Sequence, residues 1–160
     1  MDNTFQCVVV APPGKIIDCK ATSIVFPAHD GMVGVLCDHM PMFCELGLGM
    51  MEVEYMSEET GKPHNKAFVV IDKGFALIGQ NLATIVSNDA VSSIDVKKEK
   101  IEHIIERIEK KISTAVYTPD QQEHETWKVA LLKNLLAASM PALNLSNGSN
   151  SLEIAGKSSS

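Results

Sequence analysis

The stretch Pro27–Met51 reads PAHDGMVGVLCDHMPMFCELGLGMM, and it holds a short apolar segment, Met32–Leu36, between two turn signals. The first signal is the Asp30–Gly31 pair, which predicts a tight turn because glycine adopts positive φ at no steric cost. The second is the segment Cys37–Pro41, in which the residue before proline is held extended. The stretch therefore predicts a strand between two well-defined corners, a place where proteins present side chains to a partner.

The same alternation of short apolar segments and turn residues extends in both directions, from Phe5 to Ser87. The apolar segments are Phe5–Ala11, Ile16–Phe26, Met32–Leu36, Gly49–Met56, Ala67–Ile71, Phe75–Ile78 and Leu82–Val86. Turn residues separate them, among them Gly47–Gly49, Asp72–Gly74 and Gly79–Asn81. Many short strands joined by such turns predict an antiparallel β-sandwich over residues 1–90.

After residue 90 the apolar period changes and predicts two helices. Isoleucines recur at steps of three and four, which places them in one stripe on a helix; they are Ile101, Ile104, Ile105, Ile108 and Ile112. Asp95 is the expected N-cap of this first helix, because its carboxylate can accept a bond from a free backbone NH. The segment Thr118–Gln121 has the pattern of a capping box and predicts the start of the second helix.

The two helices are expected to form an antiparallel hairpin over residues 91–140, because only the short segment Ser113–Tyr117 connects them. The expected apolar stripe of the second helix consists of Trp127, Ala130, Leu131, Leu132, Leu135 and Ala138. Pro141 is expected to end this helix. Residues 141–160 are poor in apolar side chains and are predicted to be a disordered tail. The fold class is therefore β + α.

The charge of the chain argues against nucleic acid as a partner. The formal net charge is −6 and the single arginine is Arg107, so few side chains could neutralise phosphates. No apolar run approaches the length of a membrane span, and the first residues lack the basic and apolar regions of a signal peptide. We expect a soluble protein that meets a membrane only through a complex.

Common catalytic motifs do not occur in the sequence, so we expect no active site, cofactor or metal of its own. His39 stands in the second corner, where it either bonds loop backbone or faces a partner. His103 and His124 are expected to be solvated on polar helix faces. The cysteines form no CxxC pair and are expected to be free thiols, at positions 7, 19, 37 and 44. A metal-dependent hydrolase built on Cys37, His39 and Cys44 is a further alternative.

Three segments resemble the epsilon subunit of F-type ATP synthases. Phe5–Gly14, FQCVVVAPPG, is similar to the family's opening strand and turn. Gly31–Pro41, GMVGVLCDHMP, matches a pattern of Gly, Glu, any, Gly, an aliphatic pair, Pro, any, His, any, Pro. Gly74 and the segment Gly79–Val86 fit as well. The resemblance runs from about Phe5 to Ala138 and implies the same order of β-sandwich, helix and helix.

The resemblance implies a non-catalytic central-stalk subunit that couples proton-driven rotation of the c-ring, through gamma, to ATP synthesis. It implies that the sandwich contacts gamma and the c-ring with Asp30, Gly31, Met32 and His39. It further implies that the helical hairpin can reach the alpha and beta subunits and restrain ATP hydrolysis. The implied location is peripheral, on the cytoplasmic face of a bacterial inner membrane. Met32 and Cys37 stand where the family has glutamate and proline.

Some members of the family bind ATP on the hairpin, through a motif of aliphatic, Asp, two variable residues, Arg and Ala. The corresponding segment here is Ile94–Glu99, and the resemblance would place nucleotide contacts at Asp95 and Lys98. Lysine lacks the planar fork of arginine, and Glu99 adds a like charge near phosphates, so the motif is weakened. A free-standing nucleotide-sensing module is the alternative function.

Overall fold

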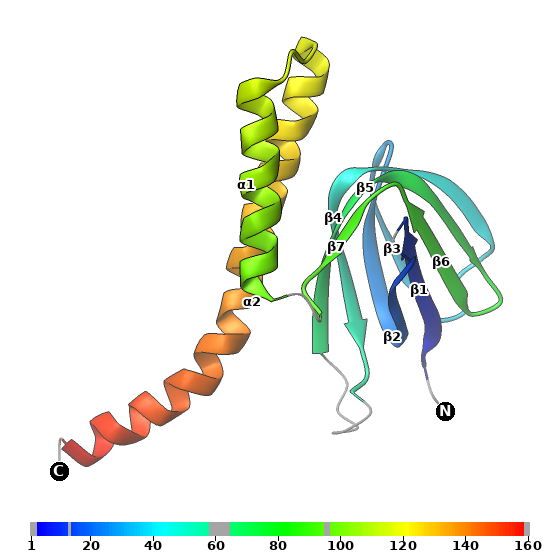
Figure 1. Cartoon of the computed structure of the whole chain (residues 1–160). Coiled ribbons are helices and arrows are strands. Elements are labelled where there is room, and N and C mark those ends of the chain that lie inside the picture. Colours follow the sequence, from blue (N-terminus) through cyan, green and yellow to red (C-terminus); the bar gives the residue numbers. More distant parts are fainter. Residues whose placement is uncertain (1–2, 13, 58–64, 95–96, 159–160) are drawn as a thin grey trace.

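The computed structural model describes residues 3–12, 14–57, 65–94 and 97–158, with side chains up to residue 138. Seven strands come first and two helices follow (Figure 1). The strands are β1 Phe5–Ala11, β2 Gly14–Ala28, β3 Gly31–Leu36, β4 Met42–Tyr55, β5 Asn65–Gly79, β6 Leu82–Ser87 and β7 Ala90–Ser92. The helices are α1 Lys98–Thr114 and α2 Pro119–Ser158.

The sheet curls into a flattened barrel. Its strand order is β1-β6-β5-β4-β2-β3, and β1 also pairs with β2, so hydrogen bonding closes on itself. The predicted sandwich is confirmed, with one difference in strand direction. All pairings are antiparallel except that of β1 with β6, which is parallel. A parallel pair needs a long crossover, and here the strands between β1 and β6 supply it.

Two of the predicted breaks are wrong, because β4 and β5 run through them as long strands. Gly74 has φ +130, and a Cβ there would lie 1.9 Å from the carbonyl oxygen of Val86. Lys73 before it has φ 56, so the pair forms a local irregularity in β5 without ending it. At Gly49 a Cβ would lie 2.8 Å from Pro27, so glycine lets β2 and β4 approach closely. These glycines permit bends, whereas the sequence predicted turns.

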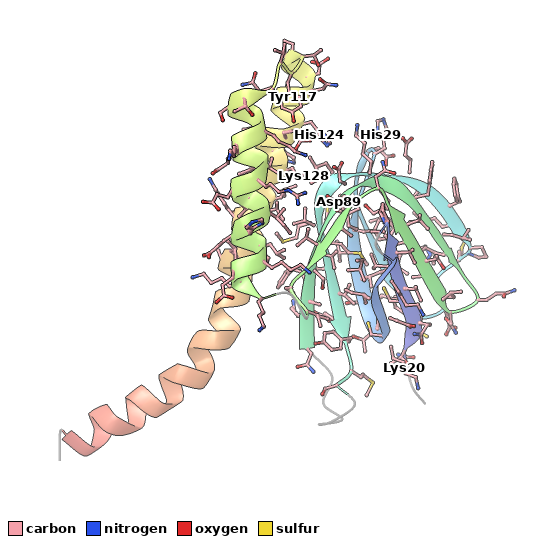
Figure 2. The ribbon with its side chains drawn as sticks, in the orientation of Figure 1. Lys20, His29, Asp89, Tyr117, His124 and Lys128 are labelled. Carbon is pink, nitrogen blue, oxygen red and sulfur yellow. The ribbon has the colours of Figure 1, made fainter. Side chains whose placement is uncertain are left out.

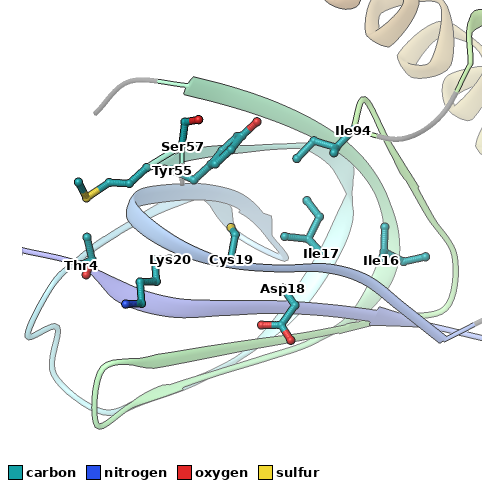
Figure 3. Close-up of a pocket in the computed structure, with 10 residues that line it drawn as sticks. Thr4, Ile16, Ile17, Asp18, Cys19, Lys20, Tyr55, Ser57 and Ile94 are labelled. Carbon is teal, nitrogen blue, oxygen red and sulfur yellow. The ribbon is translucent and has the colours of Figure 1, made fainter. Parts of the chain in front are cut away.

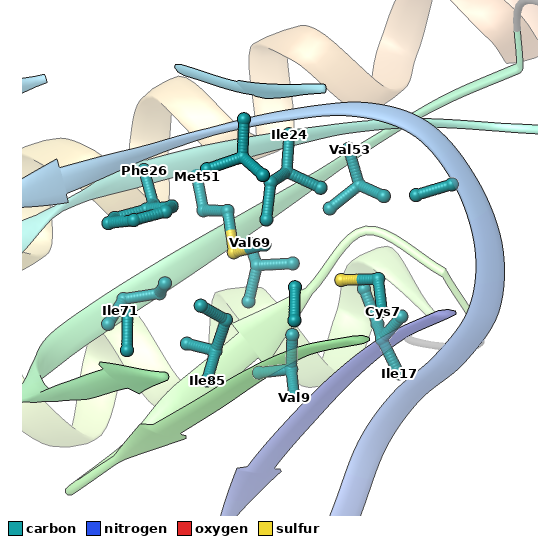
Figure 4. Packing of buried hydrophobic residues seen from close by; sticks show 14 of the residues in the cluster. Cys7, Val9, Ile17, Ile24, Phe26, Met51, Val53, Val69, Ile71 and Ile85 are labelled. Atoms are coloured by element: carbon teal, nitrogen blue, oxygen red, sulfur yellow. The ribbon is translucent and has the colours of Figure 1, made fainter. Parts of the chain in front are cut away.

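The core lies inside the barrel and is mostly aliphatic (Figure 4). Along β1 every second residue is buried, in the order Phe5, Cys7, Val9 and Ala11. The same alternation in the other strands brings Ile24, Phe26 and Met51 to the interior. Burial of one face by alternate residues is the period of two that the sequence predicted. The short strand β7, which the sequence did not predict, pairs with β5 and ends the sheet at Ser92.

The starts of the two helices differ in how well the sequence predicted them. α2 begins at Pro119, and the capping box is confirmed by reciprocal bonds between Thr118 and Gln121, at 3.2 and 3.4 Å. α1 begins at Lys98 with Lys97 as N-cap, whose side chain makes no capping bond. The prediction of Asp95 as N-cap is therefore wrong, and Asp95 itself lies outside the described residues. Backbone bonds from Lys100 and Ile101 to the Lys97 carbonyl start the helix instead.

The helices pack as an antiparallel hairpin, as predicted. Ile101 and Ile105 of α1 are buried against α2. Among the α2 side chains that the structure describes, those of Lys128, Val129, Leu132 and Leu135 are buried. Trp127 is 58% exposed, so its predicted place in the stripe is wrong. Ala130 is exposed as well, whereas Leu132 and Leu135 keep their predicted places. Lys128 and Val129 are buried in addition because α2 contacts both α1 and the sheet.

The backbone of α2 remains helical through Pro141 as far as Ser158, beyond the end predicted at Pro141. The last part of α2 extends away from the barrel and from α1 (Figure 1). Helical hydrogen bonds are local, so the backbone can continue without tertiary packing, although such a segment gains little stability in water. In the described part of the chain, neither helix combines the length and apolar character that crossing a bilayer requires.

Candidate functional site

Large apolar side chains gather on the outside of the barrel, over β4, β5 and β6. Phe43 is 67% exposed, Phe75 50%, Leu77 58% and Val86 48%. The register places Phe43 opposite Leu77, and Phe75 opposite Val86. The rings of Phe43 and Phe75 stack with centroids 5.5 Å apart. We call these four residues the outer apolar face. Clustered exposed apolar side chains mark an interaction surface.

The sequence analysis predicted none of these four residues as a contact, although Phe43 lies within Pro27–Met51. A signal was available in the unbroken apolar run Phe75–Ile78. In that run Ala76 and Ile78 are buried while Phe75 and Leu77 point outward. A strand that is apolar on both sides is typically covered on both sides, so the run indicated a partner.

The predicted contact residues lie at the two ends of β3. Asp30 lies in the turn before β3, Gly31 begins the strand at φ +143, and Met32 beside them is 59% exposed. His39 lies beyond the other end of the strand. Six residues of extended chain span roughly 17 Å. The structure therefore brings Asp30, Gly31 and Met32 together and separates them from His39.

The corner at His39 is fastened to the turn between β5 and β6. Asp38 has φ 60, and its backbone NH donates to Asn81 Oδ1 at 2.8 Å. Asn81 Nδ2 donates in return to Asp38 Oδ1 at 3.0 Å. His39 Nδ1 lies 2.7 Å from the carbonyl oxygen of Met40, so it bonds loop backbone, one of its two predicted roles. Sequence reasoning missed Asn81, whose partner lies 43 residues away.

The predicted nucleotide and metal residues form no described site. Lys98 is on the surface of α1 and pairs with Glu102 at 3.6 Å, and Asp95 is outside the described residues. Across the residues that the structure describes, no three His, Cys, Asp or Glu side chains come close enough to hold a metal ion. Cys37, His39 and Cys44 are accordingly not brought together. The zinc alternative has no geometric support.

A partly buried ionic cluster joins the hairpin to the barrel (Figure 2). Lys128 of α2 is 8% exposed, and its Nζ lies 3.0 Å from Asp72 and 2.7 Å from Asp89. His124, one turn earlier, places Nε2 3.0 Å from the other oxygen of Asp72. We call these four residues the Lys128 cluster. The prediction that His124 is solvated is wrong, because α2 turns this side chain toward β5.

The cluster changes the acidity of its members. Burial by itself would raise the pKa of Asp72, but hydrogen bonds and charge from Lys128, with a contribution from His124, lower it below 3.8. Burial would lower the pKa of Lys128, but Asp89 and Asp72 raise it above 10.5. The ionised forms of Asp72 and Lys128 are therefore both favoured.

Beside the cluster, Val70 and Val91 of the sheet pack in one apolar group with Val129 and Leu132 of α2.

Comparisons with known proteins agree with this architecture. Residues 4–93 match the family described as ATP synthase, Delta/Epsilon chain, beta-sandwich domain. The ATP synthase epsilon chain of Latilactobacillus sakei is 28% identical over 123 residues, which cover 77% of this chain and 82% of that protein. The chloroplastic ATP synthase epsilon chain of Mesostigma viride is 27% identical, over 75% of this chain and 86% of that one.

Solved structures share the fold. A chain of the Euglena gracilis mitochondrial ATP synthase, in a structure of OSCP, F1 and the c-ring, matches with a TM-score of 0.55 at 23% identity, covering 86% of this chain and 82% of that chain. A chain of the Tetrahymena thermophila mitochondrial ATP synthase central stalk and c-ring matches with a TM-score of 0.53 at 11% identity, covering 82% and 95%. With the match over residues 4–93, the chain belongs to the ATP synthase delta/epsilon family, which confirms the resemblance to F-type epsilon subunits.

Proposed function

We propose that this chain is the non-catalytic central-stalk subunit of an F-type ATP synthase, and that it couples rotation of the c-ring to gamma. The observation that carries the proposal is the outer apolar face. Rotation passes between subunits through packed surfaces, and Phe43, Phe75, Leu77 and Val86 offer such a surface on a rigid barrel. Because the chain belongs to the ATP synthase delta/epsilon family, we propose gamma as the subunit that covers the outer apolar face.

We assign the two ends of β3 to different contacts. The corner at His39 borders the outer apolar face, because it precedes Phe43 and is bonded to Asn81 beside β6. His39 is therefore a proposed gamma contact. Asp30, Gly31 and Met32 form the separate corner and are the proposed c-ring contact. With Met32 in place of the family's glutamate, that contact would be partly apolar, and Asp30 would supply its charge.

Binding to purified gamma tests the central proposal. The double substitution Phe43→Ser and Phe75→Ser removes the stacked rings and should weaken binding at least about tenfold, since buried aromatic anchors dominate such interfaces. Val25, 36% exposed on β2, provides the matched control. Val25→Ser should bind like the unmodified chain. Equal binding by the double variant, or no binding by the unmodified chain at micromolar concentration, would contradict the proposal.

We further propose that the hairpin restrains ATP hydrolysis in the assembled enzyme when it leaves the barrel. Removal of residues 95–160 should then raise ATPase activity without preventing assembly. Residues 90–94 are kept in this truncation because β7 pairs with β5 and Ile94 packs on the core. Lys128→Met weakens docking and should act in the opposite direction, lowering ATPase activity. Unchanged activity in both variants would give the helices a structural role only.

The remaining partners and the location are proposed on family membership alone. They are contact of the hairpin with the alpha and beta subunits, and a peripheral position on the cytoplasmic face of a bacterial inner membrane. Nucleotide binding at Asp95 and Lys98 stays a prediction. Calorimetry with Mg-ATP tests it, and an absence of heat at millimolar ATP would exclude it.

A further inference from the structure

Cys7 and Cys19 face each other across the first two strands. In the antiparallel pairing of β1 with β2, Cys7 lies directly opposite Cys19, and the pairs on either side are regular. The shift in register comes later, between Val9 and Val10. Directly opposite residues of such a ladder have Cα atoms about 4.5–5.5 Å apart. A disulfide spans about 4.4–6.8 Å between Cα atoms, so the backbone needs no rearrangement to form one.

Both side chains point to the inside of the barrel, where one of them is accessible. Cys7 is fully buried among the core residues (Figure 4). Cys19 is half-buried and lines a hollow of about 510 Å³, together with Ile17, Lys20 and Tyr55 (Figure 3). A small reagent that enters this hollow meets the Cys19 sulfur first.

We propose that Cys7 and Cys19 form a dithiol site that a small-molecule disulfide converts to a cross-strand disulfide. The Cys19 thiolate attacks one sulfur of the reagent, whose S–S bond breaks, and one reagent thiolate leaves. The Cys7 thiolate then attacks the Cys19 sulfur of the mixed disulfide, and the second reagent thiolate leaves. The two protons lost by the protein thiols go to the two departing thiolates. The protein is oxidised and the reagent is reduced to two thiols.

The surroundings set the order and speed of these steps. Burial, with smaller contributions from Cys19 and Asp18, raises the pKa of Cys7 to about 12. Burial and the charge of Asp18 raise the pKa of Cys19 to about 11. Cys19 therefore forms its thiolate more readily and also lies nearer to solvent. Because only the thiolate attacks, the reaction should be slow at neutral pH and accelerate about tenfold per pH unit between about pH 7 and 9.

The other two cysteines have no thiol opposite them. Cys44 lies opposite Ala76 in the ladder of β4 and β5. Cys37 donates to the carbonyl oxygen of Thr4 at 3.5 Å. Oxidation within the folded chain should accordingly select the pair Cys7 and Cys19.

The test treats the folded full-length chain with oxidised glutathione, blocks the remaining thiols by alkylation and digests with trypsin without reduction. Cleavage after Lys15 and Lys20 separates peptide 1–15, with Cys7, from peptide 16–20, with Cys19, whereas Cys37 and Cys44 stay in a third peptide. We expect peptides 1–15 and 16–20 to be joined, with the loss of two hydrogen atoms. The yield at a fixed time should rise about tenfold from about pH 7 to 8.

Two variants sharpen the outcome. Cys44→Ser should leave the link between peptides 1–15 and 16–20 intact, and Cys19→Ser should abolish it. Circular dichroism in the same samples reports whether the protein stays folded. Glutathione retained on Cys19 without a link to Cys7 would overturn the proposal. A link that forms only after unfolding in urea would overturn it as well.

Discussion

Gly74 shows how one residue lets a strand continue through an apparent break. Its φ of +130 is a conformation that side chains rarely adopt, and a Cβ would overlap the backbone of Val86. Gly74→Ala should lower the free energy of unfolding by at least about 2 kcal/mol. Gly34→Ala is the control, because a Cβ there meets open space, and it should change stability by no more than about 0.5 kcal/mol. Urea unfolding measures both, and equal losses would contradict this account.

Lys128 joins the hairpin to two carboxylates of the barrel. Lys128→Met removes the buried cation shared by Asp72 and Asp89, and because the Asp89 side chain is 48% exposed the change should cost about 2 kcal/mol of stability. Lys133→Met removes an exposed pair with Glu109 and should cost less than about 1 kcal/mol. Hydrogen exchange of α2 amides, compared with that of β1 amides, would show whether the lost stability belongs to the hairpin or to the barrel. Equal losses of stability in Lys128→Met and Lys133→Met would mean that the burial of Lys128 does not strengthen its ion pairs.

At the scale of elements, docking of α2 on the sheet should depend on pH in a defined way. The pKa of Asp72 is lowered, so its contribution is present above 3.8 and is lost as the pH falls through the lowered value. The pKa of Lys128 is raised, so its contribution is present below 10.5 and is lost as the pH rises through the raised value. The difference in unfolding free energy between the unmodified chain and Lys128→Met should therefore be larger between about pH 5 and 9 than at either extreme of pH.

Outside that window the difference should shrink at both ends. Urea unfolding at a series of pH values measures it, with Lys133→Met as the reference for a surface pair. A difference that grows toward low pH would contradict the assignment of Asp72 as the charged partner.

The elements also show what a single sequence can predict. Strand and helix periods depend on neighbouring residues, and so does the capping box at Thr118, which is why these predictions succeeded. Whether Gly47 or Gly74 ends a strand or bends it depends on a partner strand far away in sequence. The directions in which Trp127 and His124 point depend on how α2 packs on the sheet, and the apolar pattern of α2 alone carries no information about that packing. The pairing of Cys7 with Cys19 likewise depends on the register shift between Val9 and Val10, because the register at the turn, with Ala11 opposite Gly14, would otherwise place Cys7 opposite Asp18.

At the scale of the molecule, the barrel and the hairpin have separate cores. The barrel core includes Phe26, Ile71 and Ile85, whereas Val70 and Val91 face the hairpin core. A chain ending at Ile94 should therefore fold as a barrel, with cooperative urea unfolding and a β-type circular dichroism spectrum. It should bind gamma like the full chain if the outer apolar face is the contact. Failure of this chain to fold would show that the hairpin completes the barrel core.

The parallel pairing of β1 with β6 has a consequence for synthesis in the cell. During synthesis β1 leaves the ribosome first. The strand β6, which pairs with β1 and closes the barrel, is complete only at Ser87. Until then β1 can pair only with β2, and its other edge is free to join foreign strands. Contacts between residues so far apart also form slowly. The nascent chain should therefore need shielding, by a chaperone or by slow translation, until barrel closure becomes possible.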